Sequence, residues 1–128
     1  MIIRSINIHE LQGIATFSPP HHTKTTDRKL MDEACGARHF ALWHGEVEPG
    51  GMAEAHIHEE MEQVFIVLGG EGLFKVGSEK QKLGKDTIIF VPSGQTHEIH
   101  SVGDSPLRLL IFMAPPPATF DVWQKKKP

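Results

Sequence analysis

Short apolar segments alternate with turn residues along most of the chain. From residue 39 onward, apolar, β-branched or alternating runs are separated by glycine and proline. Strands of this length between tight turns are typical of an all-β domain. Helical periodicity is scarce, so we predict a β-sandwich or a β-barrel. The six predicted strands are HFALWHGEV from His39, QVFIVL from Gln63, GLFKV from Gly72, DTIIFV from Asp86, HEIHSV from His97 and LRLLIFM from Leu107.

The N-terminal third is less regular. The alternating stretch IIRSINI predicts an edge strand, and SPPHHTKTT predicts a loop. In TDRKLMDEACG we predict a short helix, with Thr26 or Asp27 as its cap and Gly36 as its stop.

Four glycine-rich segments predict tight turns between the later strands: EPGG, LGGEG, VGSEK and VGDSP. No internal repeat or linker divides the chain, whose 128 residues suit a single domain. We therefore expect a strand or arm and loop at 1–37, a barrel at 38–117 and a tail at 118–128, all in one domain.

Composition narrows the choice of function. The chain has 13 Lys and Arg against 16 Asp and Glu, so it lacks the excess of positive charge that would predict a nucleic-acid partner. The chain shows no signal peptide and no long apolar span, and its single cysteine, Cys35, cannot form an internal disulfide. We expect a cytoplasmic protein that binds neither nucleic acid nor membrane.

The first candidate metal ligands are two histidines that lie two positions apart. His56 and His58 lie at i and i+2, so on a β-strand both rings point to one face, about 6.5–7 Å apart along the backbone. Two imidazoles placed in this way can converge on one metal ion at about 2.0–2.2 Å. Further ligands must come from neighbouring strands. The candidates are Glu62 or Gln63 after a short turn and His97 after the turn PSGQT.

The segment around these residues resembles the cupin superfamily. The first cupin motif is Gly, five residues, His-x-His, three or four residues, Glu, six residues, Gly. The second motif is Pro-x-Gly-x-x-His. The first is matched by Gly50, His56, His58, Glu62 and Gly69, and the second by Pro92, Gly94 and His97.

This resemblance implies a jelly-roll β-barrel, also called a double-stranded β-helix, with one divalent metal ion per chain. By the family pattern the ion is held by His56, His58, His97 and a residue at the motif's glutamate position. Iron, manganese, nickel, cobalt and zinc all suit such a mixed nitrogen and oxygen site. The family also implies a homodimer, in which the N-terminal segment would take part.

The identity of the fourth ligand stays open between two neighbours. Counted forward from the histidines, Glu62 and Gln63 both fit the family's spacings. Counted backward from the turn in VLGGEG, the family pattern favours Gln63, with Glu62 as the alternate. A strand cannot take up a one-residue slip without turning the side chain to its other face. Glu59 and Glu60 then belong to a solvated turn.

The sequence departs from the family pattern at two places. The second motif usually begins Gly-Asp, whereas this chain has Gly84, Lys85 and Asp86, and the usual Asn after the final histidine is Ser101. Both departures are expected at strand ends, where they change a turn more than a metal ligand.

The candidates for acid–base catalysis are several, and no catalytic residue is assigned. If His97 and Ile99 face inward, His100 faces outward by strand alternation. In HFALWHGEV, either the set containing Ala41 and Trp43 or the set containing Leu42 and His44 lines the barrel. The remaining candidates are His39, Glu46 and Arg108, with His9, His21 and His22 placed in predicted loops.

We expect a metal-dependent isomerase, lyase or dioxygenase acting on a small oxygenated substrate such as a sugar acid, a hydroxy acid or a diketone. If Gln63 is the ligand, the first shell carries no negative charge, which favours isomerisation, lyase or enolisation chemistry over oxygen activation. The alternative is a non-catalytic sensor or binding module that uses the metal pocket to hold a sugar or hydroxy acid.

Overall fold

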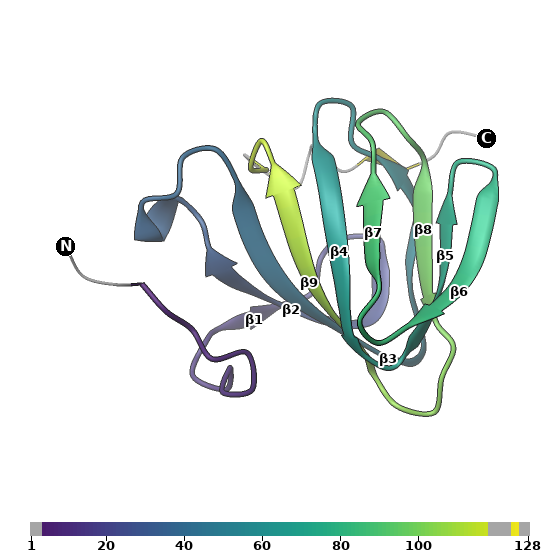
Figure 1. Cartoon of the computed structure of the whole chain (residues 1–128), viewed down its shortest axis with the longest axis horizontal. Coiled ribbons are helices and arrows are strands. Elements are labelled where there is room, and N and C mark those ends of the chain that lie inside the picture. The colour runs from purple at the N-terminus through teal and green to yellow at the C-terminus, as the bar shows by residue number, and fades with distance from the viewer. Residues whose placement is uncertain (1–3, 118–123, 126–128) are drawn as a thin grey trace.

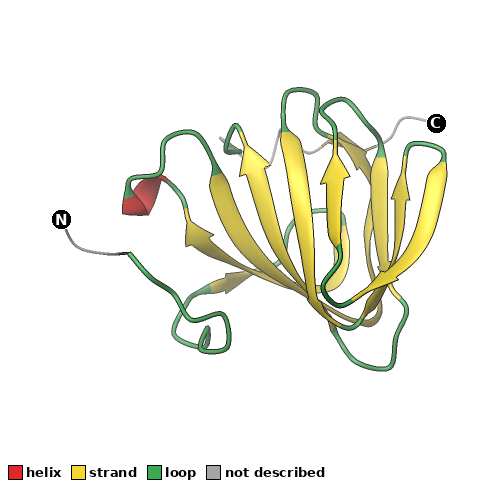
Figure 2. Cartoon of the chain, viewed as in Figure 1, coloured by secondary structure: helices red, strands yellow, loops and turns green. Residues whose placement is uncertain are grey.

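The computed structural model describes residues 4–117 and, for the backbone alone, residues 124–125. Nearly all of its regular structure is β-strand (Figures 1 and 2), which confirms the all-β prediction. The strands form one curled antiparallel sheet of the predicted jelly-roll type. They are β1 (Thr16–Phe17), β2 (His22–Met31), β3 (Ala41–Ile57), β4 (Glu62–Gly69), β5 (Glu71–Val76), β6 (Glu79–Gly84), β7 (Ile88–Val91), β8 (His97–Ser101), β9 (Leu107–Ala114) and β10 (Gln124–Lys125).

Strand β3 is the centre of the sheet, whose order is β6-β5-β8-β3-β9-β4-β7. Its first half pairs with β9 and its second half with β8, while β2 and β10 also pair with β3. One 17-residue strand therefore belongs to both sides of the curled sheet. The predicted tight turn at EPGG is wrong, because β3 continues through it with a bend at Gly50, whose φ of +85° suits glycine.

Most predictions for the C-terminal two thirds are confirmed. The later apolar runs form β4, β5, β7, β8 and β9, and turns fall at LGGEG, VGSEK and VGDSP as expected. Strand β6 was missed because its first four residues are polar and exposed, so no apolar alternation marks it. The two departures from the family pattern lie in the β6–β7 turn, where Asp86 has φ +69°, and at the last residue of β8, Ser101.

The N-terminal predictions are largely wrong. Residues 4–8 form no strand, and the rest of IIRSINI lies outside the described residues. Much of the predicted loop and helix is instead the ten-residue strand β2. Only a short 3-10 helix, Glu33–Cys35, is present, and its cap is Asp32 rather than Thr26 or Asp27. It ends at Gly36, as predicted, with φ +97°.

The N-terminal segment is part of the same sheet, because β2 pairs with both β1 and β3 of its own chain. The predicted tail at 118–128 lies outside the described residues, apart from the backbone of β10. Within the described ranges the three-residue 3-10 helix is the only helix, and no helix there is long and apolar enough to cross a membrane.

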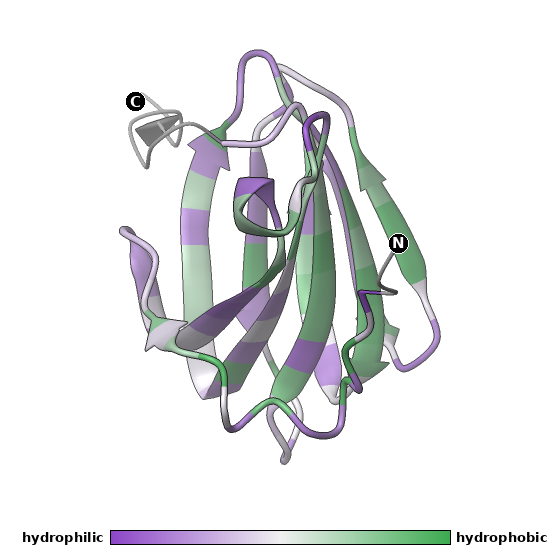
Figure 3. Cartoon of the chain, turned by 90° about the vertical axis from the view of Figure 1, so that its left-hand side faces the viewer, coloured by the Kyte–Doolittle hydropathy of each residue, from purple (hydrophilic) through white to green (hydrophobic). Residues whose placement is uncertain are grey.

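The core lies inside the curl of the sheet. Figure 3 shows hydrophilic and hydrophobic residues alternating along strands, as expected when one face is buried and the other is solvated. Alternate residues of β4, β5, β8 and β9 point inward. The largest inward side chains are Trp43, Phe65, Phe74, Ile99, Leu107, Leu109 and Met113.

Candidate metal centre

One extra residue in β3 turns the two motif histidines into the barrel. Ala53 faces Ile99 of β8 across the ladder, but three residues later His56 faces His97, only two positions from Ile99. A bulge of this kind inserts one residue and changes which side chains point inward. Ala53 is therefore buried, and so are His56 and His58. Strict alternation from Ala53 along the strand would instead place the two histidines on the outer face.

Three buried imidazoles meet inside the barrel. His56, His58 and His97 each offer a ring nitrogen, and these nitrogens all lie within 4.8 Å of one another. The ring centroids of His56 and His97 are 4.1 Å apart, and that of His58 is 4.9 Å and 5.1 Å from the two. The expected convergence of three histidines from separate stretches of backbone is thus present.

Backbone carbonyls fix the orientation of two of these rings. Nδ1 of His56 donates to the carbonyl oxygen of Glu54 at 2.6 Å, and Nδ1 of His97 donates to that of Gln95 at 3.1 Å. A carbonyl oxygen can only accept, so the proton of each neutral ring sits on Nδ1. The lone pair of Nε2 is then directed into the cluster, which is the arrangement a metal-binding histidine needs.

The donor atoms fit a divalent transition metal. Within residues 4–117, the buried Nε2 of His97 and Oε1 of Gln63 have no hydrogen-bond partner. Leaving a buried polar atom without a partner costs folding free energy, so both atoms are expected to bind a ligand. Burial lowers the pKa of His97 to about 3, and it also lowers the pKa of His56. The rings are neutral at pH 7, as metal ligation requires.

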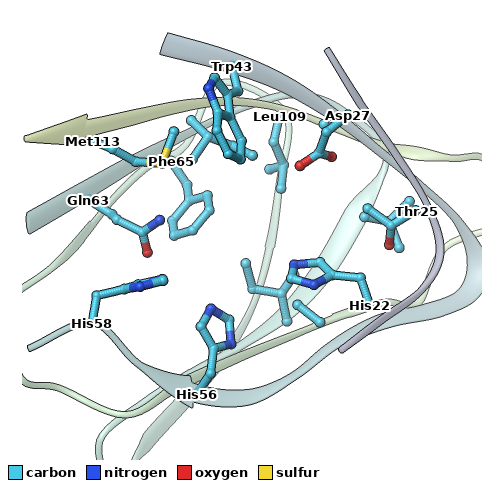
Figure 4. Close-up of a pocket in the computed structure, with 15 residues that line it drawn as sticks. His22, Thr25, Asp27, Trp43, His56, His58, Gln63, Phe65, Leu109 and Met113 are labelled. Carbon is cyan, nitrogen blue, oxygen red and sulfur yellow. The ribbon is translucent and has the colours of Figure 1, made fainter. Parts of the chain in front are cut away.

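The structure separates the two residues between which the sequence left the fourth ligand open. Both are in β4, on opposite faces of the strand. The side chain of Gln63 is buried and lines the same cavity as His56 and His58 (Figure 4). Glu62 is exposed on the outer face. Glu59 and Glu60 are exposed in the turn before β4, as predicted.

A fourth histidine of this cavity was assigned to a loop by the sequence. His22 begins β2, and its ring centroid is 5.8 Å from that of His56. Its Nδ1 donates to the carbonyl oxygen of Pro20 at 2.8 Å, the same i−2 pattern seen in His56 and His97. Burial lowers the pKa of His22 to about 4. It lines the same cavity as His56 and His58, beside the cluster of three imidazoles (Figure 4).

His22, His56 and His58 line a mainly apolar cavity. Measured as the space open to the centres of water molecules, its volume is about 40 Å³. A water needs roughly 10–15 Å³ by this measure, so the cavity holds about three waters or a ligand group of similar size. Opposite His58 lies a single carboxyl group, that of Asp27 (Figure 4). The apolar lining includes Trp43, Val47, Phe65, Leu109, Ile111 and Met113.

Two of the predicted acid–base candidates meet outside this cavity. Trp43 faces inward, so His44 faces outward, where its Nε2 accepts a hydrogen bond from Nη2 of Arg108 at 3.3 Å. Arg108 also donates to the carbonyl oxygen of Ile8 at 3.1 Å. Glu46 lines a shallow hollow beside this pair.

The remaining candidates lie away from the cavity. Ile99 faces inward and His100 outward, as predicted, and His100 contacts Glu98 on the outer face of β8. His9, His21 and His39 are exposed.

A family model and several curated proteins match the sequence. The family model described as "Cupin domain" matches residues 43–113. The tetracenomycin polyketide synthase protein TcmJ of Streptomyces glaucescens is 27% identical over 104 residues, which are 80% of this chain and 70% of that protein. The β-D-galactosidase Rv1717 of Mycobacterium tuberculosis is 32% identical over 101 residues, which are 79% of this chain and 86% of that protein.

A solved structure matches almost the whole chain. The polyketide cyclase RemF of Streptomyces resistomycificus superposes with a TM-score of 0.82 over 99% of this chain and 87% of that chain. The sequence identity is 23%, so this likeness shows the fold alone. The chain spans 52% to 62% of the length of four further curated relatives.

Proposed function

The chain belongs to the cupin domain family, and we propose that it is a metal-dependent enzyme acting on a small oxygenated molecule. One divalent ion is bound by His56, His58, His97 and Gln63, with His22 beside them. The observation that carries the proposal is the convergence of three buried imidazoles whose ring nitrogens all lie within 4.8 Å of one another. Imidazole and amide donors suit iron, manganese, nickel, cobalt and zinc.

The ligand set favours isomerase or lyase chemistry over dioxygenase chemistry. With the amide of Gln63 in place of a carboxylate, the protein ligands are all neutral, so the full charge of the ion acts on the substrate. Bound there, a divalent ion supplies Lewis acidity to a substrate oxygen. The side chains of the barrel orient the substrate and exclude water, since Phe65, Leu109 and Met113 form apolar walls.

The cavity sets the size of the substrate. A volume of about 40 Å³ for water centres admits a group of a few heavy atoms. A hydroxy acid, a short diketone or the end of a sugar acid meets this limit and carries the neighbouring oxygens that a metal ion chelates. The name of one sequence relative, a polyketide synthase protein, supports chemistry on carbonyl compounds.

Galactosidase activity, named for the mycobacterial relative, is not our proposal for this chain. Hydrolysis by the usual glycosidase mechanisms needs two carboxyl groups that flank the bond to be cleaved. Among the described residues that line the cavity, Asp27 is the only carboxylate. Glu62, the nearest candidate in sequence, is exposed on the other face of β4.

The proposal includes a cytoplasmic homodimer. The outer face of β7 and β9 supports it, because Ile88, Phe90 and Phe112 are 69%, 54% and 37% exposed. Contiguous apolar side chains on an antiparallel sheet are a common protein interface. Sedimentation should give twice the chain mass for the wild type and the single chain mass for F90K.

Metal analysis and turnover together test the proposal. Protein purified without an affinity metal should contain close to one divalent ion per chain, and H56A combined with H58A should lose it while the β-sheet circular dichroism stays unchanged. Unchanged metal content in this double variant would remove the site.

Loss of substrate from a panel of hydroxy acids, sugar acids and diketones then tests the enzyme. Binding of such a compound without turnover would favour the alternative, a non-catalytic binding or sensor module.

A further inference from the structure

Asp27 presents a carboxyl group to the cavity from strand β2. Inward and outward positions alternate here, so Thr25 and Asp27 face inward while Thr26 and Arg28 face outward. The side chain of Asp27 is 3% exposed, and its oxygens point into the cavity across from His58 (Figure 4). The carboxyl group of Asp27 thus lies in the same cavity as His56 and His58.

The fold gains nothing evident from this carboxyl group. Among the hydrogen bonds and ion pairs of residues 4–117, Oδ1 of Asp27 has no partner, although it is fully buried. Burial without a compensating partner disfavours the ionised form and raises the pKa of Asp27 from 3.8 to about 7. An apolar or amide side chain would stabilise the barrel better, so the carboxyl group is costly for folding alone.

The neighbouring strands leave room for this group and supply no charge to neutralise it. Gly45 of β3 lies directly opposite Asp27 in the ladder, and a Cβ there would lie 2.9 Å from Oδ1 of Asp27. Phe17 of β1 is its other ladder neighbour, and Cδ1 of Ile111 in β9 would lie 3.1 Å from the same Cβ at position 45. These neighbours are glycine and hydrocarbon, so the packing holds the carboxyl group without engaging Oδ1.

We propose that Asp27 is the catalytic acid–base of this cavity and moves a proton between neighbouring carbons of a small α-hydroxy carbonyl compound. The inference rests on the proposed function for the metal ion that would hold the substrate's two oxygens. Asp27 reaches the substrate from the opposite side, where the carbon-bound hydrogens of a ligand held at the imidazoles would lie.

In the proposed step, one carboxylate carries a proton from one carbon of the substrate to its neighbour. The carboxylate of Asp27 takes a proton from the carbon that carries the hydroxyl group. The C–H bond breaks, its electron pair forms the C=C bond of an enediolate, and the negative charge moves to the former carbonyl oxygen. The hydroxyl proton passes to the former carbonyl oxygen within the enediolate, and the carboxylic acid of Asp27 returns its proton to the neighbouring carbon, so no oxidant or reductant is needed.

The substrate class follows from three features of the cavity. A single carboxylate suits proton transfer between adjacent carbons on one face of the substrate. The neutral imidazole and amide donors leave a bound ion fully charged toward the two oxygens of the substrate. The volume of about 40 Å³ limits the buried part of the substrate to a few heavy atoms. A triose-sized hydroxy ketone or hydroxy aldehyde has these properties.

The first test follows hydrogen exchange at carbon. Metal-loaded protein is incubated with hydroxyacetone in D2O, and the loss of the CH2OH proton signal is followed by NMR. We expect exchange well above that of the free metal ion, and a loss of at least about a hundredfold in D27N, the usual effect of removing a general base. D104N, which changes an exposed aspartate, is the matched control and should exchange as the wild type does.

The second test counts protons and needs no turnover. The anion of acetohydroxamic acid has the shape and charge of the hydroxyacetone enediolate, and the acid releases a proton when it binds as this anion. Calorimetric titration in two buffers at a pH above the pKa of Asp27 measures the protons that reach the buffer. We expect D27N to release about one proton more per ligand than the wild type, because Asp27 no longer takes it up.

Other titratable groups near Asp27 are the same in both proteins. His22, His56 and His58 line the cavity, and Lys29 lies over the rings of Phe17 and Trp43 at its edge. If D27N does not fold, 13C NMR of the wild-type aspartate carboxyls replaces it, and one buried carboxyl signal should move to its protonated position on ligand binding.

The possible results separate this inference from the proposed function. Equal exchange and equal proton release in D27N and wild type would overturn the role of Asp27, and metal content would still decide the proposed function. A metal-loaded wild type that neither exchanges hydroxyacetone nor binds acetohydroxamic acid would overturn the substrate class. Loss of metal and of exchange in H56A combined with H58A supports the proposed function, and loss of exchange in metal-loaded D27N supports the role of Asp27.

Discussion

Two buried histidines on opposite faces of the sheet show what makes a metal ligand in this barrel. His97 and His44 have the same exposure, 2% each. Burial lowers the pKa of both, to about 3 for His97 and about 4 for His44. Neither burial nor basicity therefore distinguishes them.

Their hydrogen bonds do distinguish them. The backbone holds Nδ1 of His97, so Nε2 points at two other imidazoles. Nε2 of His44 is occupied by the guanidinium of Arg108, and Arg28 adds a second nearby positive charge. A cation is favoured at the first position and repelled at the second. A histidine becomes a candidate ligand through the direction of its lone pair and the charge it faces.

The largest expected effect separates these two residues directly. H97A should weaken metal binding by about 4 kcal/mol, on the order of a thousandfold, as expected when one of four ligands is lost from a site worth up to about 16 kcal/mol. H44A should leave the affinity unchanged. Competition with a chromophoric chelator measures both. Equal weakening by the two substitutions would break the comparison.

The next largest effect is a pH-dependent change in stability caused by Asp27, measured on chelator-treated protein. Because the pKa of Asp27 rises from 3.8 unfolded to about 7 folded, the folded state binds the proton more tightly. Stability is then unaffected below the unfolded pKa, falls as the pH rises between the two values, and is constant above the folded pKa.

Between about pH 5 and about pH 7 this one residue should cost the wild type about 2 kcal/mol relative to D27N. Urea unfolding at the two pH values measures the difference. A constant difference between wild type and D27N over this range would show that Asp27 titrates normally.

A smaller effect sharpens the choice between the neighbouring residues of β4. Q63A should weaken metal binding about tenfold, or about 1.4 kcal/mol, because the amide oxygen is one weak donor beside three imidazoles. E62A should have no effect on the metal, since its side chain is exposed on the other face. Isothermal titration with zinc compares the two. A larger loss in E62A than in Q63A would reverse the assignment.

The smallest effect concerns the outer site alone. R108A removes the hydrogen bonds to His44 and to the carbonyl oxygen of Ile8, and should cost about 1 kcal/mol of stability. The metal content should stay that of the wild type. Thermal unfolding with parallel elemental analysis checks both. Loss of metal in R108A would show that the two faces of the sheet are coupled.

Sequence reasoning succeeded where the residues face the hydrophobic core. The strands β4, β5, β8 and β9 alternate because their inward positions are apolar, and the spacing of the His-x-His and Pro-x-Gly-x-x-His segments located the three converging histidines. Alternation also placed His100 outside the barrel.

It failed where a strand faces the cavity. The inward positions of β2 include Thr25 and Asp27, so no apolar alternation marks the strand, and DRKLM carries good helix formers. His22 escaped notice for a second reason, a register shift in β2 between Thr23 and Thr25 that turns it inward. Polar residues that face a cavity break the apolar alternation by which a strand is recognised, and this hid both His22 and Asp27.

The central claim is that one ion binds where the three imidazoles meet. Anomalous diffraction from crystals grown with cobalt tests it most directly. A single peak at about 2.0–2.2 Å from Nε2 of His56, His58 and His97 is the predicted result. A peak bound instead at exposed histidines such as His9 or His21, with none between these three rings, would contradict it.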